Sequence, residues 1–424
     1  MISLISNKTI NAATVISISI FLMTAACSKK NTANNGGSTT TPVVSAEVTI
    51  NATETHQTIR GFGCATVFNP PNTTAYTAEE FDRLFGAGTG QVGLNILRIR
   101  IASDDAWRAT ELNHAKWAVQ RGALVFASPW SPPARMKTNG NIIGGKLKPD
   151  SAAAYAKYLN DFAVYMAANG VPLEAVSVQN EPDWEPSYEG CVWTATEMRD
   201  FIKNYGAIIT ATKLMAPELV NNNQTYVNTI LNDAGAAANL DIIGTHLYGG
   251  GIVENSTAKT LNKEVWMTEH LDTLTNWSGN INTAIEIHDC FTKANFNAYT
   301  WWYGKRFYGP LGQDGAVTKR GYIISQFARF IKAGAVRLGT GANSRTDVLV
   351  SAYKNGTKKV FVLINWGSNN VKQKITLQGT SVSSMLPYTT SETKNTEAGT
   401  AVTVNSNSFE YTLPAKSVVT LVEQ

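Results

Sequence analysis

The chain has 424 residues, of which 43% are hydrophobic and 16% are charged, and its formal net charge is +4 at pH 7. These proportions are typical of a folded globular protein with one large core, or one large and one small, and they exclude a largely disordered chain. The small net charge, with no long run of lysine and arginine, argues against binding to nucleic acid.

The N-terminus has the features of an export signal. Lys8 lies ahead of an apolar stretch at residues 15–26 that is too short to span a bilayer. The small residues Thr24-Ala25-Ala26 precede Cys27, as in bacterial lipoprotein signals, where the cysteine becomes the lipidated N-terminus. An ordinary secretory signal with an accidental cysteine is the alternative. In both cases residues 1–27 predict an exported protein. It would sit on the outer membrane or cell surface through a lipid anchor, its only membrane contact, or else be periplasmic or secreted.

Residues 28–45 begin with SKKNTANNGGSTTT, a polar stretch without periodicity that predicts a flexible linker. The remaining cysteines, Cys64, Cys191 and Cys290, are odd in number and widely spaced. They therefore support neither a disulfide framework nor a zinc site, and at most one disulfide can form among them. We expect no metal and no organic cofactor.

From residue 60 to residue 337, short apolar runs typical of strands alternate with helical patterns. The expected strands are residues 60–68, 94–101, 124–130, 175–178, 213–218, 241–248, 264–268 and 298–303. Helix signals lie between them, such as a capping box from Thr77 to Glu80 and an apolar stripe at residues 151–169 that stops at Gly170. Eight such units favour a (β/α)8 barrel, or TIM barrel, over a doubly wound sheet.

After Arg337 the helical pattern stops. The runs VLVSAYK and KKVFVLINW are joined by Asn355-Gly356, which predicts a hairpin with a tight turn. We expect residues 338–424 to form a small β-sandwich attached to the barrel, with residues 46–59 as its first strand or strands. The two ends of the chain would then meet in one side domain.

Two of the expected barrel strands lead into a glutamate in the same manner. The fourth leads into VSVQNEP with Glu181, and the seventh ends VWMTEH with Glu269, where catalytic groups of such barrels lie. Cleavage of a glycosidic bond needs such a pair. One carboxylic acid protonates the leaving oxygen, while a carboxylate attacks the anomeric carbon or activates water. Structural roles are the alternative: a surface carboxylate in a turn for Glu181, and an ion pair with His270 or Arg98 for Glu269.

Further polar side chains near the strand ends suit a sugar site. Asn180 places an amide beside Glu181, and Tyr248 could hydrogen-bond a nucleophilic carboxylate. His246 is expected to be structural, with an orienting role at most.

Large aromatic residues also fall at or just after strand ends: Trp130, Trp184, Trp301, Trp302 and Tyr303. Because neighbouring strand residues point to opposite sides, at least one of Trp301 and Trp302 should face the cleft. We expect Trp130 and Trp302 to bind substrate. No Gly-x-Ser-x-Gly elbow, Walker loop or HExxH is present, so serine-hydrolase, nucleotide and zinc chemistry are unsupported.

The motifs SVQNEPDW, DIIGTHLYG, VWMTEH, AYTWWYGKRFYGPL and DGAVTKRGYIISQFARF occur in this order. In them the chain resembles glycoside hydrolase family 30, specifically its bacterial glucuronoxylanase subfamily, over about residues 46–424. The resemblance implies a TIM barrel with a side β-sandwich. It also implies a retaining endo-β-1,4-xylanase that cuts glucuronoxylan relative to its (4-O-methyl)glucuronic acid branches.

The resemblance also implies roles for single residues. Glu181 would be the acid/base and Glu269 the nucleophile. The residues that it places around the cleaved bond are Asn180, Arg98, Tyr248 and Trp302. In the KRFYG motif, Arg306 and Tyr308 would hold the uronate, since a guanidinium suits a carboxylate. Lys305, the first basic residue of this motif, is expected to be solvated.

One stretch departs from the subfamily. There, a Tyr two residues after the nucleophile and a Ser shortly beyond also hold the uronate, whereas this chain has Leu271 followed by DTLT. Leu271 cannot donate a hydrogen bond, and each bond lost to a charged ligand costs on the order of 1.5–3 kcal/mol. We therefore expect a softened dependence on the branch.

Two alternatives stay open beside the glucuronoxylanase. One is a family 30 glycosidase acting on another β-glycan, such as a β-1,6-glucan. The other is a non-catalytic, glycan-binding surface lipoprotein. In each case we expect a monomer whose partner is a polysaccharide.

Overall fold

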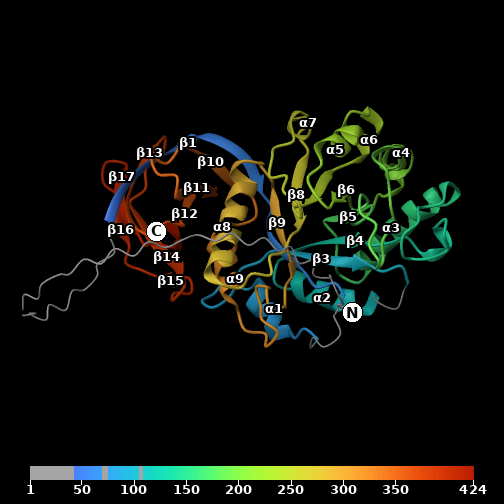
Figure 1. Ribbon diagram of the computed structural model, residues 1–424, viewed down its shortest axis with the longest axis horizontal. Coiled ribbons are helices and arrows are strands. Elements are labelled where there is room, and N and C mark those ends of the chain that lie inside the picture. The colour runs from blue at the N-terminus through green and yellow to red at the C-terminus, as the bar shows by residue number, and fades with distance from the viewer. Residues whose placement is uncertain (1–42, 69–74, 105–107) are drawn as a thin grey trace, which may run out of the picture. The chain divides into compact units, whose positions relative to one another are not determined.

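The computed structural model describes residues 43–68, 75–104 and 108–424 (Figure 1). The expected export signal, Cys27 and residues 28–42 lie outside the described residues. Residues 43–45, which the sequence assigned to the linker, are the start of strand β1 (Val43–Ile59), because they pair with β13 (Asn370–Gln378). Within these ranges, no helix is long and apolar enough to cross a membrane.

Eight parallel strands close into a barrel, as the sequence predicts. Every expected strand is present, and only the ends differ by a few residues. The barrel strands are β2 (Gly61–Ala65), β3 (Ile96–Ile101), β4 (Leu124–Pro129), β5 (Ala175–Ser177), β6 (Lys213–Leu219), β7 (Ile242–His246), β8 (Glu264–Glu269) and β9 (Ala298–Tyr303).

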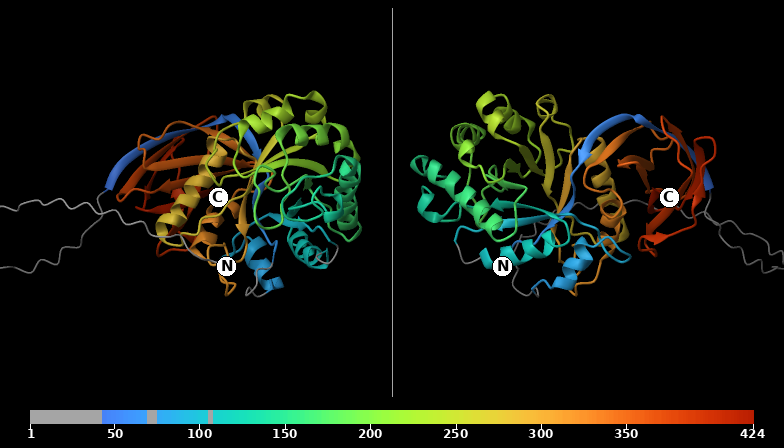
Figure 2. Two further views of the ribbon diagram at one scale, coloured as in Figure 1. Left: turned by 45° about the vertical axis from the view of Figure 1, so that its right-hand side comes forward. Right: turned by 180° about the vertical axis from the view of Figure 1, so that it is seen from behind.

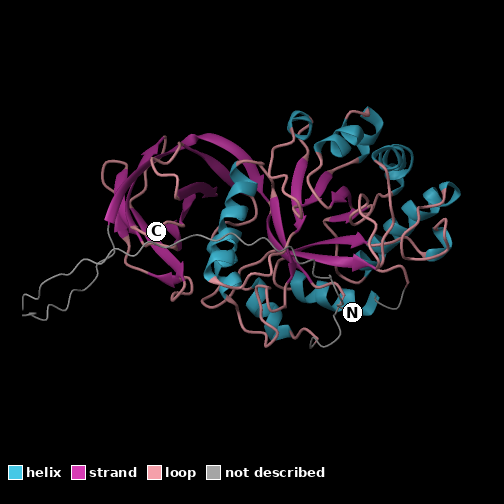
Figure 3. Ribbon diagram, in the orientation of Figure 1, coloured by secondary structure: helices cyan, strands magenta, loops and turns pink. Residues whose placement is uncertain are grey.

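Helices alternate with these strands and lie outside the barrel (Figure 3). They are α1 (Ala78–Phe85), α2 (Arg108–Val119), α3 (Ala152–Ala168), α4 (Ala195–Tyr205), α5 (Gln224–Leu231), α6 (Ala234–Asn239), α7 (Ser256–Thr260), α8 (Trp277–Thr292) and α9 (Lys319–Ala328). The expected capping box is present at the start of α1, where Thr77 and Glu80 bond to each other's backbone amide. Gly170, just after α3, has a φ of +83°, which only glycine adopts without strain.

An apolar layer closes the lower part of the barrel interior. It consists of one buried residue from each of seven strands: Ile96, Phe126, Ala175, Met215, Ile242, Trp266 and Ala298. Because side chains alternate along a strand, the residue two positions further on points inward again. These next positions include the small residues Ser128, Gly244 and Thr300, beside the long side chain of Arg98. A polar layer therefore lies above the apolar one, at the C-terminal ends of the strands.

The side domain is a single curled sheet built from both ends of the described chain. Besides β1 and β13 it contains β10 (Ala335–Thr340), β11 (Val348–Asn355), β12 (Lys358–Asn365), β14 (Ser384–Ser391), β15 (Glu397–Ala398), β16 (Val402–Thr403), β17 (Ser408–Leu413) and β18 (Ser417–Glu423). In Figures 1 and 2 the blue β1 lies among orange and red strands, antiparallel to β10 and parallel to β13. This sheet has a hydrophobic core of its own, which includes Ile50, Leu363 and Ile375.

The expected hairpin joins β11 to β12, one residue further along than the sequence suggested. Asn355 pairs with Lys358, so the two central residues are Gly356 and Thr357. Gly356 has a φ of +57°, as tight hairpin turns require at their first central position.

Barrel and side domain share buried contacts. The Gln326 side chain of α9 donates to Thr390 (2.7 Å) and accepts from Thr420 (2.6 Å), both in the sheet. Cys64, Cys191 and Cys290 are buried and free, so no disulfide forms among them.

Candidate active site

A cleft of about 870 Å³ opens at the C-terminal ends of the barrel strands. Its lining residues are Phe68, Trp130, Glu181, Asp183, Trp184, Tyr188, Glu189, Val220, Asn221, Tyr248, Glu269, Leu271, Trp302 and Tyr303. All of them end a barrel strand or follow one. A cleft that combines many aromatic side chains with several convergent polar groups is typical of a small-molecule or glycan site.

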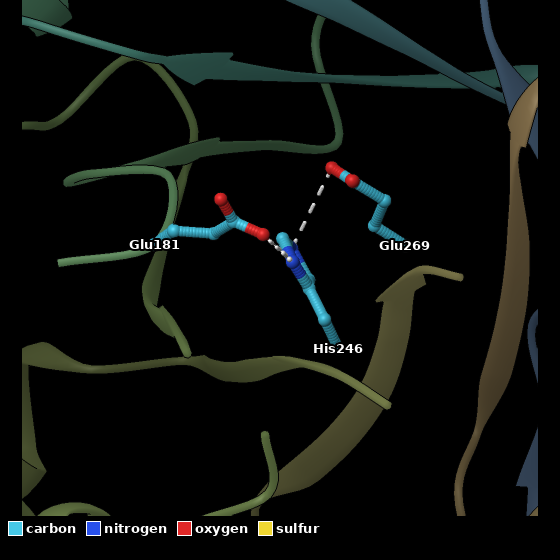
Figure 4. Close-up of side chains that lie close together, drawn as sticks. All are labelled: Glu181, His246 and Glu269. Carbon is cyan, nitrogen blue, oxygen red and sulfur yellow. Dashed lines mark hydrogen bonds and ion pairs between the residues drawn. The ribbon is translucent and has the colours of Figure 1, made fainter. Parts of the chain in front are cut away.

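Glu181 follows β5 and is held in an uncommon backbone conformation. Its φ is +48°, which costs a non-glycine residue free energy and persists only where the surroundings enforce it. The Glu181 amide donates to the carbonyl of Glu218 (2.9 Å), and the Trp184 amide closes a turn on the carbonyl of Glu181 (3.1 Å). The side chain is buried and points toward His246 (Figure 4). Glu181 is therefore a fixed carboxylate of the cleft, and the surface alternative is wrong.

Glu269 is the last residue of β8, and both of its carboxylate oxygens have partners. Oε2 forms an ion pair with Arg98, and Oε1 accepts a hydrogen bond from the Tyr248 hydroxyl (2.7 Å). The ion pair that the sequence offered as a structural alternative thus exists, while Glu269 also lines the cleft. Glu269 is therefore both a partner in a buried ion pair and a candidate catalytic carboxylate of the cleft.

Arg98 is fully buried beneath the carboxylates. Besides Glu269 it contacts Glu218 (Nη2–Oε1 3.0 Å) and Ser128. Burial opposes its charge, but Glu218 and Glu269 outweigh that effect and raise the pKa of Arg98. The expected direct contact of Arg98 with substrate is therefore not supported, since the side chain has no exposed surface. Arg98 instead positions the groups that border the cleft.

Asn180 is one of the groups that Arg98 positions. Its Oδ1 accepts a hydrogen bond from Arg98 Nη2 (2.6 Å), so the orientation of the amide is fixed. Among the residues described, Nδ2 has no acceptor. This nitrogen is the donor that the sequence assigned to a sugar hydroxyl.

His246, at the end of β7, lies between the two carboxylates (Figure 4). Its Nδ1 is 3.1 Å from Glu181 Oε1, and its Nε2 is 3.9 Å from Glu269 Oε2. Burial disfavours a charge on the imidazole, but Glu269, Glu181 and Glu218 outweigh it and raise the pKa of His246 to about 9. The orienting role expected for His246 agrees with this placement between Glu181 and Glu269.

Glu218, which the sequence did not single out, is a third carboxylate of the same cluster. It follows Pro217 in β6, is fully buried and contacts Arg98. Burial alone would raise its pKa, but Arg98 and His246 outweigh burial and lower it to about 2. A signal was available, because a third expected strand ended in glutamate. A Cβ at Gly244 on neighbouring β7 would lie 2.6 Å from Cγ of Glu218, so glycine is what makes room for this side chain.

Aromatic rings form one side of the cleft. Trp130 and Trp302 lie with ring centres 5.8 Å apart, and Tyr303 packs 4.7 Å from Trp302. Trp301 is buried, so Trp302 is the member of the pair that faces the cleft, as alternation predicts.

The residues expected to hold a uronate lie after β9, next to this aromatic side. The Arg306 guanidinium lies 5.6 Å from the ring centre of Tyr303, and its Nε is buried without a hydrogen-bond partner in the described part of the chain. Tyr308 is buried, and neither residue is among those that line the cleft. Leu271 lines both the cleft and a neighbouring cavity of about 340 Å³.

Lys305 is not solvated, contrary to expectation. Its side chain is buried and forms an ion pair with Glu80 (2.7 Å) of α1. It is therefore part of the packing between α1 and the β9–α9 loop.

Glu181, His246 and Glu269 are close enough to be considered as metal ligands, since one oxygen or nitrogen of each lies within 4.8 Å of the others. A histidine binds metal only in its neutral form. The neighbouring carboxylates raise the pKa of His246 to about 9, so a metal would have to displace a proton from this imidazole before it could bind here.

The chain is similar to known glycosidases along most of its length. The family model "Glycosyl hydrolase family 30 TIM-barrel domain" matches residues 93–274. The chain is 38% identical to the glucuronoxylanase XynC of Bacillus subtilis (strain 168), with 90% of this chain and 92% of that protein covered. Among solved structures, the subfamily 8 xylanase Xyn30A from Clostridium acetobutylicum has a TM-score of 0.84 at 39% identity, covering 89% of this chain and 99% of that one.

A family 30 endoxylanase from Clostridium papyrosolvens C71 has a TM-score of 0.82 at 37% identity, with 89% of this chain and 100% of that one covered. These matches span the barrel and the side domain alike. The chain belongs to glycoside hydrolase family 30.

Proposed function

We propose that the protein is a retaining endo-β-1,4-xylanase that cleaves glucuronoxylan. The observation that carries the reaction is the short gap between the carboxylates, whose nearest oxygens are within 4.8 Å across the cleft. Retaining glycosidases separate the two groups by about 5–5.5 Å, and inverting enzymes by about 6.5–9.5 Å to admit a water. The choice of xylan rests on the glucuronoxylanase and xylanase relatives.

The reaction would run in two displacements. Glu269 attacks the anomeric carbon while Glu181 gives its proton to the departing glycosidic oxygen, so that a covalent glycosyl-enzyme forms as the glycosidic bond breaks. Glu181 then takes a proton from water, which attacks the same carbon and releases Glu269. Arg98 and Tyr248 hold the attacking carboxylate by both oxygens, and His246 holds Glu181.

Replacement of each carboxylate tests this assignment. Glu269→Gln should lower kcat on glucuronoxylan by at least about a thousandfold, and Glu181→Gln by about 10² to 10⁴. Glu264→Gln is the matched control, because Glu264 is at the opposite end of the same strand and pairs with Arg60. Activity of Glu269→Gln within a few-fold of wild type would show that the nucleophile is wrongly assigned.

Recognition of the glucuronate branch is the finer part of the proposal. We infer that Arg306 binds the uronate. Leu271 weakens this binding, because the leucine borders the cleft and offers no hydrogen-bond donor. Arg306→Ala should lower kcat/KM on branched xylan more than on unbranched xylan, and Leu271→Tyr should increase the preference for branched xylan. If Arg306→Ala lowered kcat/KM equally on both xylans, this residue would not recognise the branch.

Two alternative functions can be distinguished from the glucuronoxylanase by the products that are released. A family 30 enzyme for another β-glycan is favoured by Leu271, and it would release sugars from a β-1,6-glucan faster than from any xylan. A non-catalytic binder would retain xylan without producing reducing ends. Products that carry the uronate at a fixed position support the glucuronoxylanase.

We propose further that the protein is exported as a monomer with a lipid on Cys27. The apolar stretch and the small residues before Cys27 support this. In a host that processes lipoproteins, mass spectrometry should find a diacylglyceryl group on Cys27, and Cys27→Ala should release the protein from membranes. Cleavage at another residue would indicate an ordinary secretory signal.

A further inference from the structure

The hydroxyl that bonds to the proposed nucleophile belongs to a side chain with little support from its own loop. Tyr248 donates to Glu269 Oε1 (2.7 Å) and is 36% exposed. Its amide bonds to the carbonyl of Val220 (3.1 Å), which fixes the backbone but not the ring. The next three residues, 249–251, are all glycine. Because glycine has no side chain to pack against the tyrosine ring, neighbouring elements must hold that ring in place.

Two imidazole rings contact Tyr248. Its ring centre lies 6.0 Å from that of His246 and 5.3 Å from that of His270. His246 belongs to the charged cluster between the two catalytic carboxylates. His270 directly follows Glu269 in the sequence and is not among the residues that line the cleft. The contact between His270 and Tyr248 therefore lies behind the substrate site.

His270 is itself fixed from outside the barrel by Glu286 of α8. Its Nδ1 lies 2.8 Å from each carboxylate oxygen of Glu286. A carboxylate only accepts hydrogen bonds, so Nδ1 must carry a proton and donate. Glu286 Oε1 also accepts a hydrogen bond from the Tyr299 hydroxyl of β9 (2.6 Å). The carbonyl of His270 accepts from the Trp302 amide (2.9 Å), so both the backbone and the side chain of His270 are fixed.

We propose that His270 and Glu286 are positioning residues for the nucleophile. Glu286 fixes the imidazole of His270, and the imidazole fixes the Tyr248 ring so that its hydroxyl meets Glu269. Neither residue touches the substrate. A displacement of a reacting group by about 1 Å can cost about a hundredfold in rate, so support at this distance affects catalysis. This inference rests on the proposed role of Glu269 in glycosidic bond cleavage.

Two conservative variants test the proposal on whichever β-glycan the wild type cleaves fastest. His270→Phe keeps a ring beside Tyr248 but loses the donor to Glu286. Glu286→Gln keeps the shape but replaces one of its two accepting oxygens by an NH2 group. In each variant kcat should fall about three- to tenfold, the effect of one lost hydrogen bond. KM should stay within about twofold of wild type, because neither side chain lines the cleft.

A double-mutant cycle separates positioning from general damage to the fold. In Tyr248→Phe the hydroxyl is absent, so adding His270→Phe should lower kcat by less than about a further twofold. Independent damage would instead multiply the two losses. Asp289→Asn is the matched control, because Asp289 is an acid of the same helix that pairs with Lys293 (2.7 Å), and this variant should keep the wild-type kcat.

Wild-type kcat in both His270→Phe and Glu286→Gln would overturn the proposal, and so would losses that multiply with that of Tyr248→Phe. Glu269→Gln is measured beside them. If Glu269→Gln is inactive while the two variants match wild type, the positioning role alone is wrong. Activity of Glu269→Gln near wild type would overturn the assignment of the nucleophile and this inference with it.

Discussion

Removal of the charge on Glu218 is the sharpest test of how the site is stabilised. In Glu218→Gln the side chain keeps its shape, but Arg98 loses one of its two carboxylate partners. Both side chains are fully buried, so water cannot replace the lost charge. Breaking a buried ion pair by neutralising one partner typically costs 3–5 kcal/mol, because the other charge remains buried.

The pKa of Glu218 gives a second value for the loss of stability expected in Glu218→Gln. The folded protein lowers it from 4.5 to about 2, because Arg98 and His246 outweigh burial. Each pKa unit is worth about 1.4 kcal/mol, so the charge contributes about 3 kcal/mol at neutral pH. Since the folded pKa is depressed, this contribution is fully present above pH 4.5 and is lost as the pH falls toward 2.

Denaturant unfolding of wild type and Glu218→Gln between pH 3 and pH 7 checks both statements. The variant should be less stable by about 3 kcal/mol at pH 7, and the difference should shrink below pH 4.5. Glu264→Gln is the control, because its pair with Arg60 is partly exposed and should contribute less than about 1 kcal/mol. A loss below about 1 kcal/mol in Glu218→Gln, or one that does not change with pH, would refute the reasoning.

Three further predictions follow from the same cluster. Tyr248→Phe removes the hydroxyl bonded to Glu269 (2.7 Å), and kcat should fall by about ten- to a hundredfold, whereas an unchanged kcat would exclude a role for this bond. The pKa of His246 is about 9 in the folded protein, against its ordinary 6.5. The charged imidazole therefore stabilises the folded protein fully below pH 6.5, and this stabilisation is lost as the pH rises through 9. Wild-type stability should therefore fall over that range more steeply than that of His246→Gln in denaturant unfolding, and parallel slopes would contradict the charged imidazole. Gly244→Ala brings a Cβ within 2.6 Å of Glu218, so thermal unfolding should show a loss of about 1–3 kcal/mol, and a neutral effect would mean that Glu218 can move aside.

The sequence predicted most of the architecture because the signals for it are local. Short apolar runs between helical patterns located all eight barrel strands. Thr77 and Glu80 marked a helix start that the structure confirms. The strand ends also pointed to Glu181 and Glu269, since the C-terminal ends of parallel strands meet at one face. The domain built from both ends followed from the loss of helical pattern after Arg337.

Contacts between strands far apart in the sequence could not be predicted in the same way. Hydrophobic periodicity says which side chains point inward, but not how deep a long side chain lies or what it meets there. Arg98 was therefore assigned to the substrate, although it is buried beneath the carboxylates, and Glu218 was overlooked. Lys305 was expected in solvent, because its partner Glu80 lies on a helix far away in the sequence, although the two are in contact in the fold.

The sequence by itself determined the barrel, the side domain and the two glutamates at the ends of its strands. Only the tertiary structure decided the short gap between those glutamates, the cation below them and the imidazolium between them. The physical reason is that the closure of the barrel sets these distances, and closure depends on all eight strands at once. Charge and burial at Arg98, His246 and Glu218 are likewise properties of the assembled cluster, because each group is stabilised by the others.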